Sequence, residues 1–374
     1  MELKSIKRTR KVFYVIYLLV VTLLLLELIL RICNPFHFRI KGDTILLEAN
    51  KTFVVNNNDI PLLDKKIIHT KNELGFRGQG KPDSMGKYLS IILIGGSTTE
   101  CQFLNDGKTW SDDLYRLLKT SFDKVWVNNA GIAGHSTFGH IVLLKDHISK
   151  LKPKVAVFLV GCNDIGRDDL TGSDKSNMQG YYANFFTFLS KNSEVFNVIG
   201  NLIRVRKANL RQLTDRYIDV KARMNDTLVL TDKFIEEQLA VQKHYLPFYE
   251  ARLKTILRLC RQENILPVFL TQPSLFGNAT DSETGAHLAV FKLGPFYNGK
   301  LWWNLQEVYN NVTKKVAREE NVFLIDLSDQ MPKNSRYFYD IVHFTNTGAE
   351  KVADILFKNL KPYLSEKFPQ YIKH

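Results

Sequence analysis

Three short polar motifs, far apart in the chain, together carry the groups that acyl transfer requires. Gly95-Gly96-Ser97-Thr98 offers a hydroxyl, Gly161-Cys162-Asn163-Asp164 an amide, and Asp340-Ile341-Val342-His343 a carboxylate with an imidazole. A serine hydroxyl is a poor nucleophile until a base takes its proton. In such a set the imidazole is the base, the carboxylate orients it, and the amide stabilises the oxyanion. Each motif alone is weak evidence, so the prediction depends on all three.

The spacing of Asp340 and His343 suits a base held by a carboxylate. Across three residues on a tight loop, Asp340 can reach Nδ1 of His343 and leave Nε2 for Ser97. The alternative is that both belong to a helix N-terminus. A helix is expected directly afterwards, with Thr347 as its N-cap and Glu350 completing a capping box. Since Thr347 would supply the cap, Asp340 and His343 are left for another role.

Ser97 and two further residues provide a hydroxyl and donors for an oxyanion. Ser97 follows two glycines, where a tight turn can expose its Oγ, although such a turn can also simply cap the next helix. The side-chain amide of Asn163 and the backbone N–H groups of Gly134 and Ser97 are candidate donors, each contributing about 3 kcal/mol. The alternatives are an Asx turn at Asn163 and a plain strand-to-helix turn at Gly134.

Apolar runs alternate with helical patterns over most of the chain. This alternation predicts βαβ units and an α/β fold with a mostly parallel sheet, whose carboxyl ends form the ligand-binding edge. Ser97, Gly134 and Asn163 all come just after predicted strands, which favours one shared site. The predicted strands are 88–94, 125–127, 155–160, 265–270 and 322–325, and the predicted helices are 109–118, 138–148, 233–262 and 303–319.

Four segments, in order, resemble the blocks of the SGNH (GDSL-like) hydrolase superfamily. They are 95–99, 129–134, 161–164 and 340–343, and 72–78 is similar to a segment often found ahead of the serine block in bacterial members. The resemblance covers about 70–360. It implies a three-layer α/β/α flavodoxin-like fold, Ser97 as nucleophile, Gly134 and Asn163 as oxyanion donors, and a triad completed by Asp340 and His343. Gly96 replaces the acidic residue of Gly-Asp-Ser, a common variant.

The N-terminus carries a membrane signal. Residues 13–30 are apolar with one charge, Glu27, and are just long enough to span a bilayer. The basic residues ahead of them predict a cytoplasmic N-terminus. A cleaved signal peptide is the alternative, but 31–34 offers no small-residue cleavage site. Glu27 either reaches the membrane interface or contacts another helix. The basic residues are Lys4, Lys7, Arg8, Arg10 and Lys11.

The predicted organisation is therefore a single-pass membrane protein with an extracytoplasmic catalytic domain, periplasmic or at the cell surface if the source is bacterial. We expect a cytoplasmic tail at 1–12, an anchor at 13–31, a stalk at 32–87 and the hydrolase domain at 88–365. A helical insertion at about 165–232 interrupts the domain. Its aromatic pairs at 181–182 and 185–186 and the basic residues Arg204, Arg206, Lys207 and Arg211 suit either a lid over the strand edge or a solvated helical hairpin.

Charge and composition limit the partners. The formal net charge of +13 favours an anionic neighbourhood, either a membrane surface or an acidic polymer, unless it is only a solvated surface. Nucleic acid fits poorly with an extracytoplasmic domain. Neither metal nor nucleotide motifs are present, so no cofactor is expected. The four cysteines match no zinc site, and Cys101 and Cys162 either pair or stay free with the others. His135 and His140, which flank the glycine segment of Gly134, are expected only to cap or line the site.

These observations predict a membrane-tethered serine esterase that removes short acyl groups from extracytoplasmic glycans. Acetyl is the acyl group that we expect. An acyltransferase using the same acyl-enzyme is one alternative, because sequence does not decide whether water or a sugar hydroxyl reaches that intermediate. A lipase-type esterase and a non-catalytic binding protein are the others.

Overall fold

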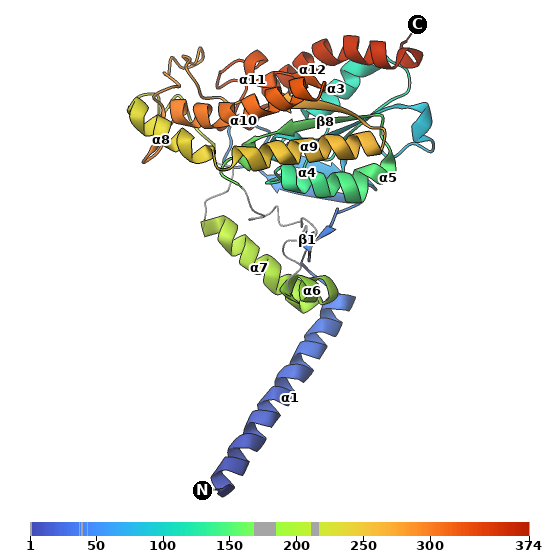
Figure 1. Cartoon of the computed structure of the whole chain (residues 1–374), viewed down its shortest axis with the longest axis vertical. Coiled ribbons are helices and arrows are strands. Elements are labelled where there is room, and N and C mark those ends of the chain that lie inside the picture. Colours follow the sequence, from blue (N-terminus) through green and yellow to red (C-terminus); the bar gives the residue numbers. More distant parts are fainter. Residues whose placement is uncertain are drawn as a thin grey trace. The chain divides into compact units, whose positions relative to one another are not determined.

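The computed structural model describes residues 2–36, 38, 40–42, 44–167, 185–210 and 217–373. The chain divides into two compact units (Figure 1). The smaller unit comprises Met1–Leu46 and Lys175–Leu213, and the larger comprises Leu47–Asp174 and Thr214–His374. Each is described separately below.

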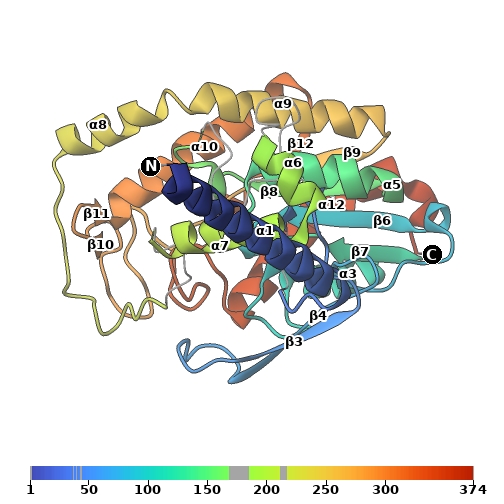
Figure 2. The ribbon, with the colours of Figure 1, turned by 90° about the horizontal axis from the view of Figure 1, so that it is seen from below.

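A six-stranded sheet forms the centre of the larger unit. Its four parallel strand pairings confirm the mostly parallel α/β prediction. One short strand pairs antiparallel at an edge. Strands β6, β7 and β8 are buried along their whole length, which explains why they read as continuous apolar runs. Figure 2 shows β6 and β7 side by side. The order across the sheet is β12 (Phe323–Ile325), β9 (Leu266–Thr271), β8 (Val155–Val160), β6 (Leu89–Gly95), β7 (Val125–Asn129) and β5 (Arg77–Gly78).

The strand order places a crevice at the centre of the sheet. Counted along the chain, the parallel strands lie in the flavodoxin-like order 2-1-3-4-5, with β6 first and β8 third. The direction of winding reverses between β6 and β8, and ligands bind beyond the carboxyl ends of strands at such a point. Ser97 follows β6 and Asn163 follows β8. Two of the three sequence motifs therefore begin at the switch point.

Helices cover both faces of the sheet and complete three layers (Figure 1). One face packs against α3 (Trp110–Lys119) and α12 (Asn346–Lys367). On that face Ile91 and Leu93 of β6 join one apolar core with Trp110, Leu114 and Leu356. The other face carries α4, α9 and α10. These helices and the remaining elements of the unit are α4 (Thr137–Leu143), a π-helical turn (Leu144–Ile148), α5 (Ser149–Leu151), α8 (Asp232–Gln242), α9 (Leu246–Gln262), α10 (Gly299–Glu319), α11 (Leu327–Gln330) and the hairpin β10 (Lys292–Gly294) to β11 (Tyr297–Asn298).

Several helix boundaries differ from the sequence prediction. The helix predicted at 303–319 begins at Gly299, and the one predicted at 138–148 is α4 followed by a π-helical turn. The pattern at 233–262 is two helices, α8 and α9, with Pro247 in the first turn of α9. Proline lacks the N–H that a helix interior requires, so it suits the start of a new helix and not the middle of one long helix. The N-cap of α12 is Thr345, whose side chain accepts the N–H of Gly348, and not Thr347.

Residues 47–87, expected within a stalk, pack on the larger unit. They form the antiparallel hairpin of β3 (Lys51–Asn56) and β4 (Lys66–Lys71), followed by β5, which extends the central sheet. Residues 47–87 therefore belong to the packed structure of the larger unit and do not only connect it to the N-terminal helix. The reason is visible in β4, where alternate side chains, such as Ile67 and His69, are buried.

The smaller unit contains the N-terminal helix and part of the predicted insertion. Its elements are α1 (Glu2–Ile32), β1 (Ile40–Lys41), β2 (Thr44–Ile45), α6 (Phe185–Asn192) and α7 (Glu194–Leu210). Within α1, residues Arg10–Ile32 are long and apolar enough to cross a membrane. The pair Tyr181-Tyr182 lies outside the described residues. Whether the insertion covers the strand edge as a lid stays a prediction.

Candidate active site

Ser97 begins the one-turn helix α2 (Ser97–Glu100) immediately after β6. The two glycines before it are required by close packing. A Cβ on Gly95 would lie 2.1 Å from Oγ1 of Thr99, and a Cβ on Gly96 would lie 2.5 Å from Nδ2 of Asn163. Glycine is the residue that permits such an approach. The Gly-Gly-Ser sequence thus allows a sharp strand-to-helix turn that leaves Ser97 partly exposed while its neighbours are buried.

The structure brings Ser97, His343 and Asp340 together in one hydrogen-bonded chain. Nε2 of His343 lies 2.7 Å from Oγ of Ser97, and Nδ1 lies 2.6 Å from Oδ2 of Asp340. A carboxylate at Nδ1 favours the tautomer with a proton on that nitrogen, so Nε2 is left to accept the serine proton. The ring of His343 also stacks on Tyr339, with centroids 5.5 Å apart. This arrangement can generate a serine nucleophile.

Asp340 is fixed by its own loop. Its Oδ1 accepts the backbone N–H groups of Val342 at 2.9 Å and His343 at 2.8 Å, so that Oδ2 faces the imidazole. Because the carboxylate is buried, with 5 % of its surface exposed, these bonds hold it in one orientation. The three-residue spacing therefore produces a compact loop that precedes α12 and does not belong to it.

Asn163 lies at the same corner of the sheet as Ser97. It belongs to a short 3-10 turn (Cys162–Asp164) after β8, and its Nδ2 donates to the carbonyl of His135 at 3.0 Å while touching Gly96. A side-chain amide carries two N–H groups, so one beyond the bond to His135 can serve a substrate oxygen. The position suits an oxyanion donor.

Gly134 lies in a loop that is fastened to the serine turn. The N–H of Ile132 donates to the carbonyl of Gly95 at 3.1 Å, and the N–H of Ala133 donates to Oε2 of Glu100 at 2.6 Å. Gly134 itself has a φ of +79°. A residue with a Cβ is strained in this left-handed conformation, which explains glycine at this position. Two hydrogen bonds thus connect this loop to the strand end and the turn that carry Ser97.

Glu100 was not singled out by the sequence reasoning. It is buried, with 1 % exposed, and its Oε1 lies 2.9 Å from Nζ of Lys71 while Oε2 holds the N–H of Ala133. Through Ala133 it positions the backbone of Gly134. No spacing rule points to this residue. The available signal was an acid three positions after Ser97 in an otherwise buried turn.

Loss of Glu100 should reduce turnover by displacing the loop of Gly134. We expect Glu100→Ala to lower kcat on a small ester about 100-fold with little change in KM, because Gly134 is a candidate oxyanion donor and such a donor acts mainly in the transition state. Glu100→Gln, which keeps an acceptor for Ala133, should recover part of the loss. Steady-state kinetics of both variants check this. A Glu100→Ala protein that is less stable but turns over normally would make Glu100 purely structural.

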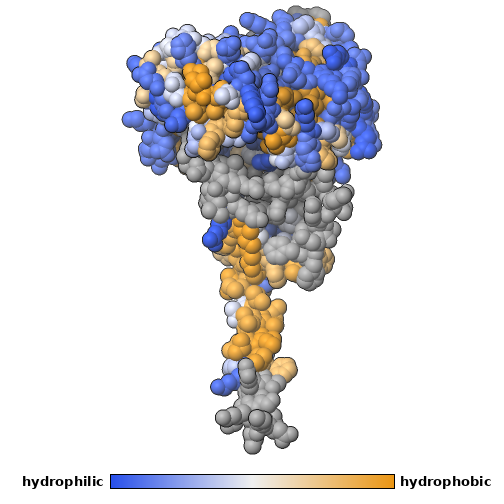
Figure 3. Space-filling model, turned by 60° about the vertical axis from the view of Figure 1, so that its left-hand side comes forward, coloured by the Kyte–Doolittle hydropathy of each residue, from blue (hydrophilic) through white to orange (hydrophobic). Residues whose placement is uncertain are grey.

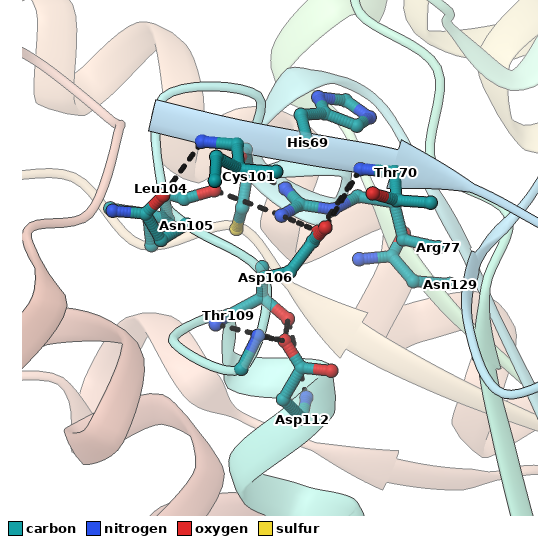
Figure 4. A network of polar contacts seen from close by, with 12 residues as sticks. His69, Thr70, Arg77, Cys101, Leu104, Asn105, Asp106, Thr109, Asp112 and Asn129 are labelled. Atoms are coloured by element: carbon teal, nitrogen blue, oxygen red, sulfur yellow. Dashed lines mark hydrogen bonds and ion pairs between the residues drawn. The ribbon is translucent and has the colours of Figure 1, made fainter. Parts of the chain in front are cut away.

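Arg77 holds the other end of the serine turn (Figure 4). Its guanidinium donates to the backbone carbonyls of Glu100 at 3.0 Å, Cys101 at 2.6 Å and Leu104 at 2.9 Å, and it pairs with Asp106 at 2.9 Å. Carbonyls at a helix C-terminus have no partner within the helix, and Arg77 supplies one. The segment 72–78, which resembles a segment found ahead of the serine block, thus stabilises the C-terminal end of α2 through Arg77.

His69 lies beside this network and is buried. Burial lowers the pKa of its imidazole to about 3, and the nearby cations of Arg77 and Lys71 act in the same direction. The carboxylates of Glu100, 3.9 Å away, and of Asp106 raise the pKa, but these are smaller effects than burial and the two cations. His69 is accordingly neutral in the folded protein. Figure 4 shows it next to Thr70 and Arg77.

The neutral His69 makes the fold sensitive to acid. Its folded pKa lies below the usual value of 6.5, so the unfolded chain binds more protons and stability is lost as the pH falls below about 6.5. From pH 7.5 to pH 5.0 we expect a loss of about 2 kcal/mol from this group. Urea unfolding at both values should show a smaller difference in His69→Gln. Equal pH dependence in the two proteins would contradict the assignment.

Asp164, the residue after Asn163, forms a buried ion pair with Arg252. The guanidinium of Arg252 lies 3.1 Å from Oδ1 of Asp164 and donates through Nε to Oγ1 of Thr137 at 2.7 Å. It also stacks over the ring of Phe138, 4.0 Å from the centroid. The pair joins the turn of Asn163 to α4 and α9, so it fixes the carboxyl end of β8. Sequence alone did not link Arg252 to the motif at 161–164.

Removing Arg252 should destabilise the larger unit. Arg252→Ala leaves a buried carboxylate without its cation, and we expect the free energy of unfolding to fall by about 3–5 kcal/mol. Arg258→Ala, an exposed arginine on the same helix, should change it by less than about 0.5 kcal/mol. Denaturant unfolding of both variants tests this. Similar small effects for both would show that the ion pair contributes little.

Other sequence candidates occupy supporting positions. His135 and His140 are buried, and the carbonyl of His135 holds Asn163. All four cysteines lie in the described residues and none forms a disulfide, so Cys101 and Cys162 are not disulfide-bonded in this structure. In the part of the chain that the structure describes, no group of three His, Cys, Asp or Glu side chains is arranged to hold a metal ion.

Comparison with protein families decides the classification. The model of the GDSL-like lipase/acylhydrolase family matches residues 93–351, more than half of the chain. The chain belongs to this family. It is therefore a serine ester hydrolase, and the GDSL-like resemblance read from the motifs is confirmed. A search of curated proteins gives no match.

Solved structures similar to this chain include three hydrolases. The acetylxylan esterase Axe2 from Geobacillus stearothermophilus has 16% identity and a TM-score of 0.42 over 72% of this chain and 93% of that one. The lipase/acylhydrolase from Enterococcus faecalis has 15% identity and a TM-score of 0.40 over 73% and 95%. A GDSL-like lipase from Bacteroides thetaiotaomicron has 11% identity and a TM-score of 0.39 over 77% and 93%.

Proposed function

We propose that Ser97 is the nucleophile of this hydrolase, with His343 as the general base and Asp340 as its orienting carboxylate. The observation that carries the proposal is the unbroken chain of hydrogen bonds from Oγ of Ser97 through the imidazole to Oδ2 of Asp340, at 2.7 and 2.6 Å. Ser97 and His343 are 246 positions apart, and nothing in the local sequence requires their side chains to form this hydrogen bond.

The mechanism follows from the positions of these groups. Oγ of Ser97 attacks the ester carbonyl carbon while Nε2 of His343 takes its proton. The oxyanion accepts N–H groups from Asn163, Gly134 and Ser97. When the ester C–O bond breaks, His343 returns the proton to the leaving alkoxide. Water then attacks the acyl-enzyme with His343 again as base, which releases the acid and restores Ser97.

The proposed setting is the outer side of a membrane, with α1 as the anchor and short acyl esters on glycans as substrates. The span Arg10–Ile32 and the basic residues before it support this topology. The net charge of +13 suits an anionic polymer or membrane surface. In this proposal residues 1–12 form the cytoplasmic tail and residues 88–365 form the hydrolase domain.

The acyl preference can be measured with a series of p-nitrophenyl esters. We expect kcat/KM to be largest for acetate and to fall as the chain lengthens to decanoate. A rise with chain length would instead identify a lipase-type esterase. Full-length protein in detergent should also be incubated with an acetyl donor and an oligosaccharide. Free acetate is the expected product, and acetylated oligosaccharide in its place would reassign the enzyme as an acyltransferase.

A further inference from the structure

Helix α7 buries two polar side chains beside Val195 and Val198 and exposes three large apolar ones. The polar Asn197 and Asn201 are 3% and 5% exposed, and Nδ2 of Asn201 donates to Oδ1 and to the carbonyl of Asn197, both at 2.9 Å. Ile199, Leu202 and Ile203 are instead 41%, 51% and 50% exposed. A surface helix in water turns its apolar residues to the core. The outer face of α7 is therefore suited to apolar surroundings.

The exposed apolar residues form a defined stripe. Positions 199, 202 and 203 are separated by three and four residues, so they share one side of the helix, and Arg206 follows on that side. Arg204 and Lys207 add further cations in the sequence. Phe188 of α6 is also 63% exposed. An apolar stripe that ends in Arg and Lys is typical of helices that lie among lipid headgroups.

The start of α7 is fastened to α1 through Glu27. The Glu27 carboxylate accepts Oγ–H of Ser193 at 2.7 Å and the N–H groups of Glu194 and Val195, both at 3.1 Å. These are the unpartnered donors of a helix N-terminus, where negative charge is favoured. Arg31 completes the junction by binding Glu27 at 2.8 Å and the carbonyl of Asn192 at 2.7 Å. Glu27 was expected either to reach the membrane interface or to contact another helix, and the structure shows the contact with the start of α7.

The surface of α1 next to this junction is apolar as well. Leu28, Ile29 and Ile32 are 55%, 55% and 78% exposed, and Figure 3 shows a nearly continuous hydrophobic surface along α1. Since Glu27 joins α7 to α1 five residues before α1 ends, whatever surrounds this end of α1 also reaches the first turns of α7. A bilayer is the surrounding that the span Arg10–Ile32 requires.

We infer that the α6–α7 hairpin is an in-plane membrane element, with the α7 stripe (Ile199, Leu202 and Ile203) in the lipid of the outer leaflet and its basic residues against anionic headgroups. The inference rests on the proposed anchoring by α1. It gives the hairpin a defined partner, the bilayer itself.

Tryptophan depth measurements on the full-length protein test the inference. Ile203→Trp is reconstituted in phosphatidylcholine–phosphatidylglycerol vesicles with or without dibrominated lipid, which quenches only tryptophans within the bilayer. Val241→Trp on α8, 54% exposed in the larger unit, is the matched control. Leu24→Trp in α1 reports the anchor. We expect quenching several-fold above the wild-type background for Ile203→Trp and Leu24→Trp, and none for Val241→Trp.

Each outcome has a distinct meaning. Quenching at position 24 without quenching at 203 would overturn the hairpin inference and leave the anchor intact. No quenching at either position would overturn the anchor as well. Blue-shifted but unquenched emission at 203 would mean that protein, such as a second copy of the chain, covers the stripe, which also contradicts the inference. Ile199→Trp serves as a second variant, and retained ester turnover shows that each protein is folded.

Discussion

Ser97→Ala should lower kcat on an acetyl ester by about 10⁴- to 10⁶-fold, the scale of loss seen when the nucleophile of a serine triad is removed. The reason is that the Ser97 hydroxyl is the group that lies 2.7 Å from Nε2 of His343. The proposed oxyanion donors at Asn163 and Gly134 stay in place, so a small residual rate over water is expected. Hydrolysis of p-nitrophenyl acetate by purified wild type and variant measures the effect.

The same substitution should hardly change stability, because Ser97 is partly exposed and alanine fits its turn. Thermal unfolding of Ser97→Ala should therefore resemble that of wild type. Ser84→Ala, an exposed serine away from the site, is the matched control and should retain full turnover. If Ser97→Ala kept most of the activity, the nucleophile would have to lie elsewhere in the chain.

Asp340→Asn should lower kcat by about 10⁴-fold while leaving the loop folded. The amide oxygen of asparagine can still accept the N–H groups of Val342 and His343, but its NH₂ group then faces Nδ1. Nδ1 must become an acceptor, which moves the imidazole proton to Nε2. His343 would then donate to Ser97 and could not take its proton.

The control for Asp340→Asn is Asp329→Asn, an exposed carboxylate on α11 whose substitution should be silent. Measuring kcat and the unfolding midpoint for both variants separates chemistry from folding. An Asp340→Asn enzyme within 10-fold of wild type would show that the carboxylate does not set the tautomer of His343.

Local patterns predicted the sheet and the position of the site well, because strands buried on both faces leave little ambiguity. The runs that became β6 and β8 end in Gly95-Gly96 and Gly161, so their carboxyl ends could be placed before the structure was known. The β6–β8 switch point then required Ser97 and Asn163 to be neighbours. The contact between Ser97 and His343 was predicted because a serine nucleophile requires a base. The sequence periodicity did not indicate it.

What the sequence could not provide were the contacts made across the fold by single side chains. Arg252 pairs with Asp164 across 88 positions, and Glu27 caps a helix that begins 167 positions later. Such pairs have no local spacing, and many Arg and Glu residues could serve equally well. Helix breaks were missed for a different reason, since the apolar pattern of α8 continues into α9 and only Pro247 marks the boundary.

The most direct test of the account is covalent trapping with a fluorophosphonate, which reacts with an activated serine and leaves unactivated hydroxyls unmodified. Wild-type protein should gain one phosphonyl group and lose activity in parallel, and peptide mass spectrometry should place the group on Ser97. Substitution of His343 by alanine should abolish the labelling. Complete inactivation with the adduct on another serine, or full activity after Ser97 is modified, would contradict the triad of Ser97, His343 and Asp340.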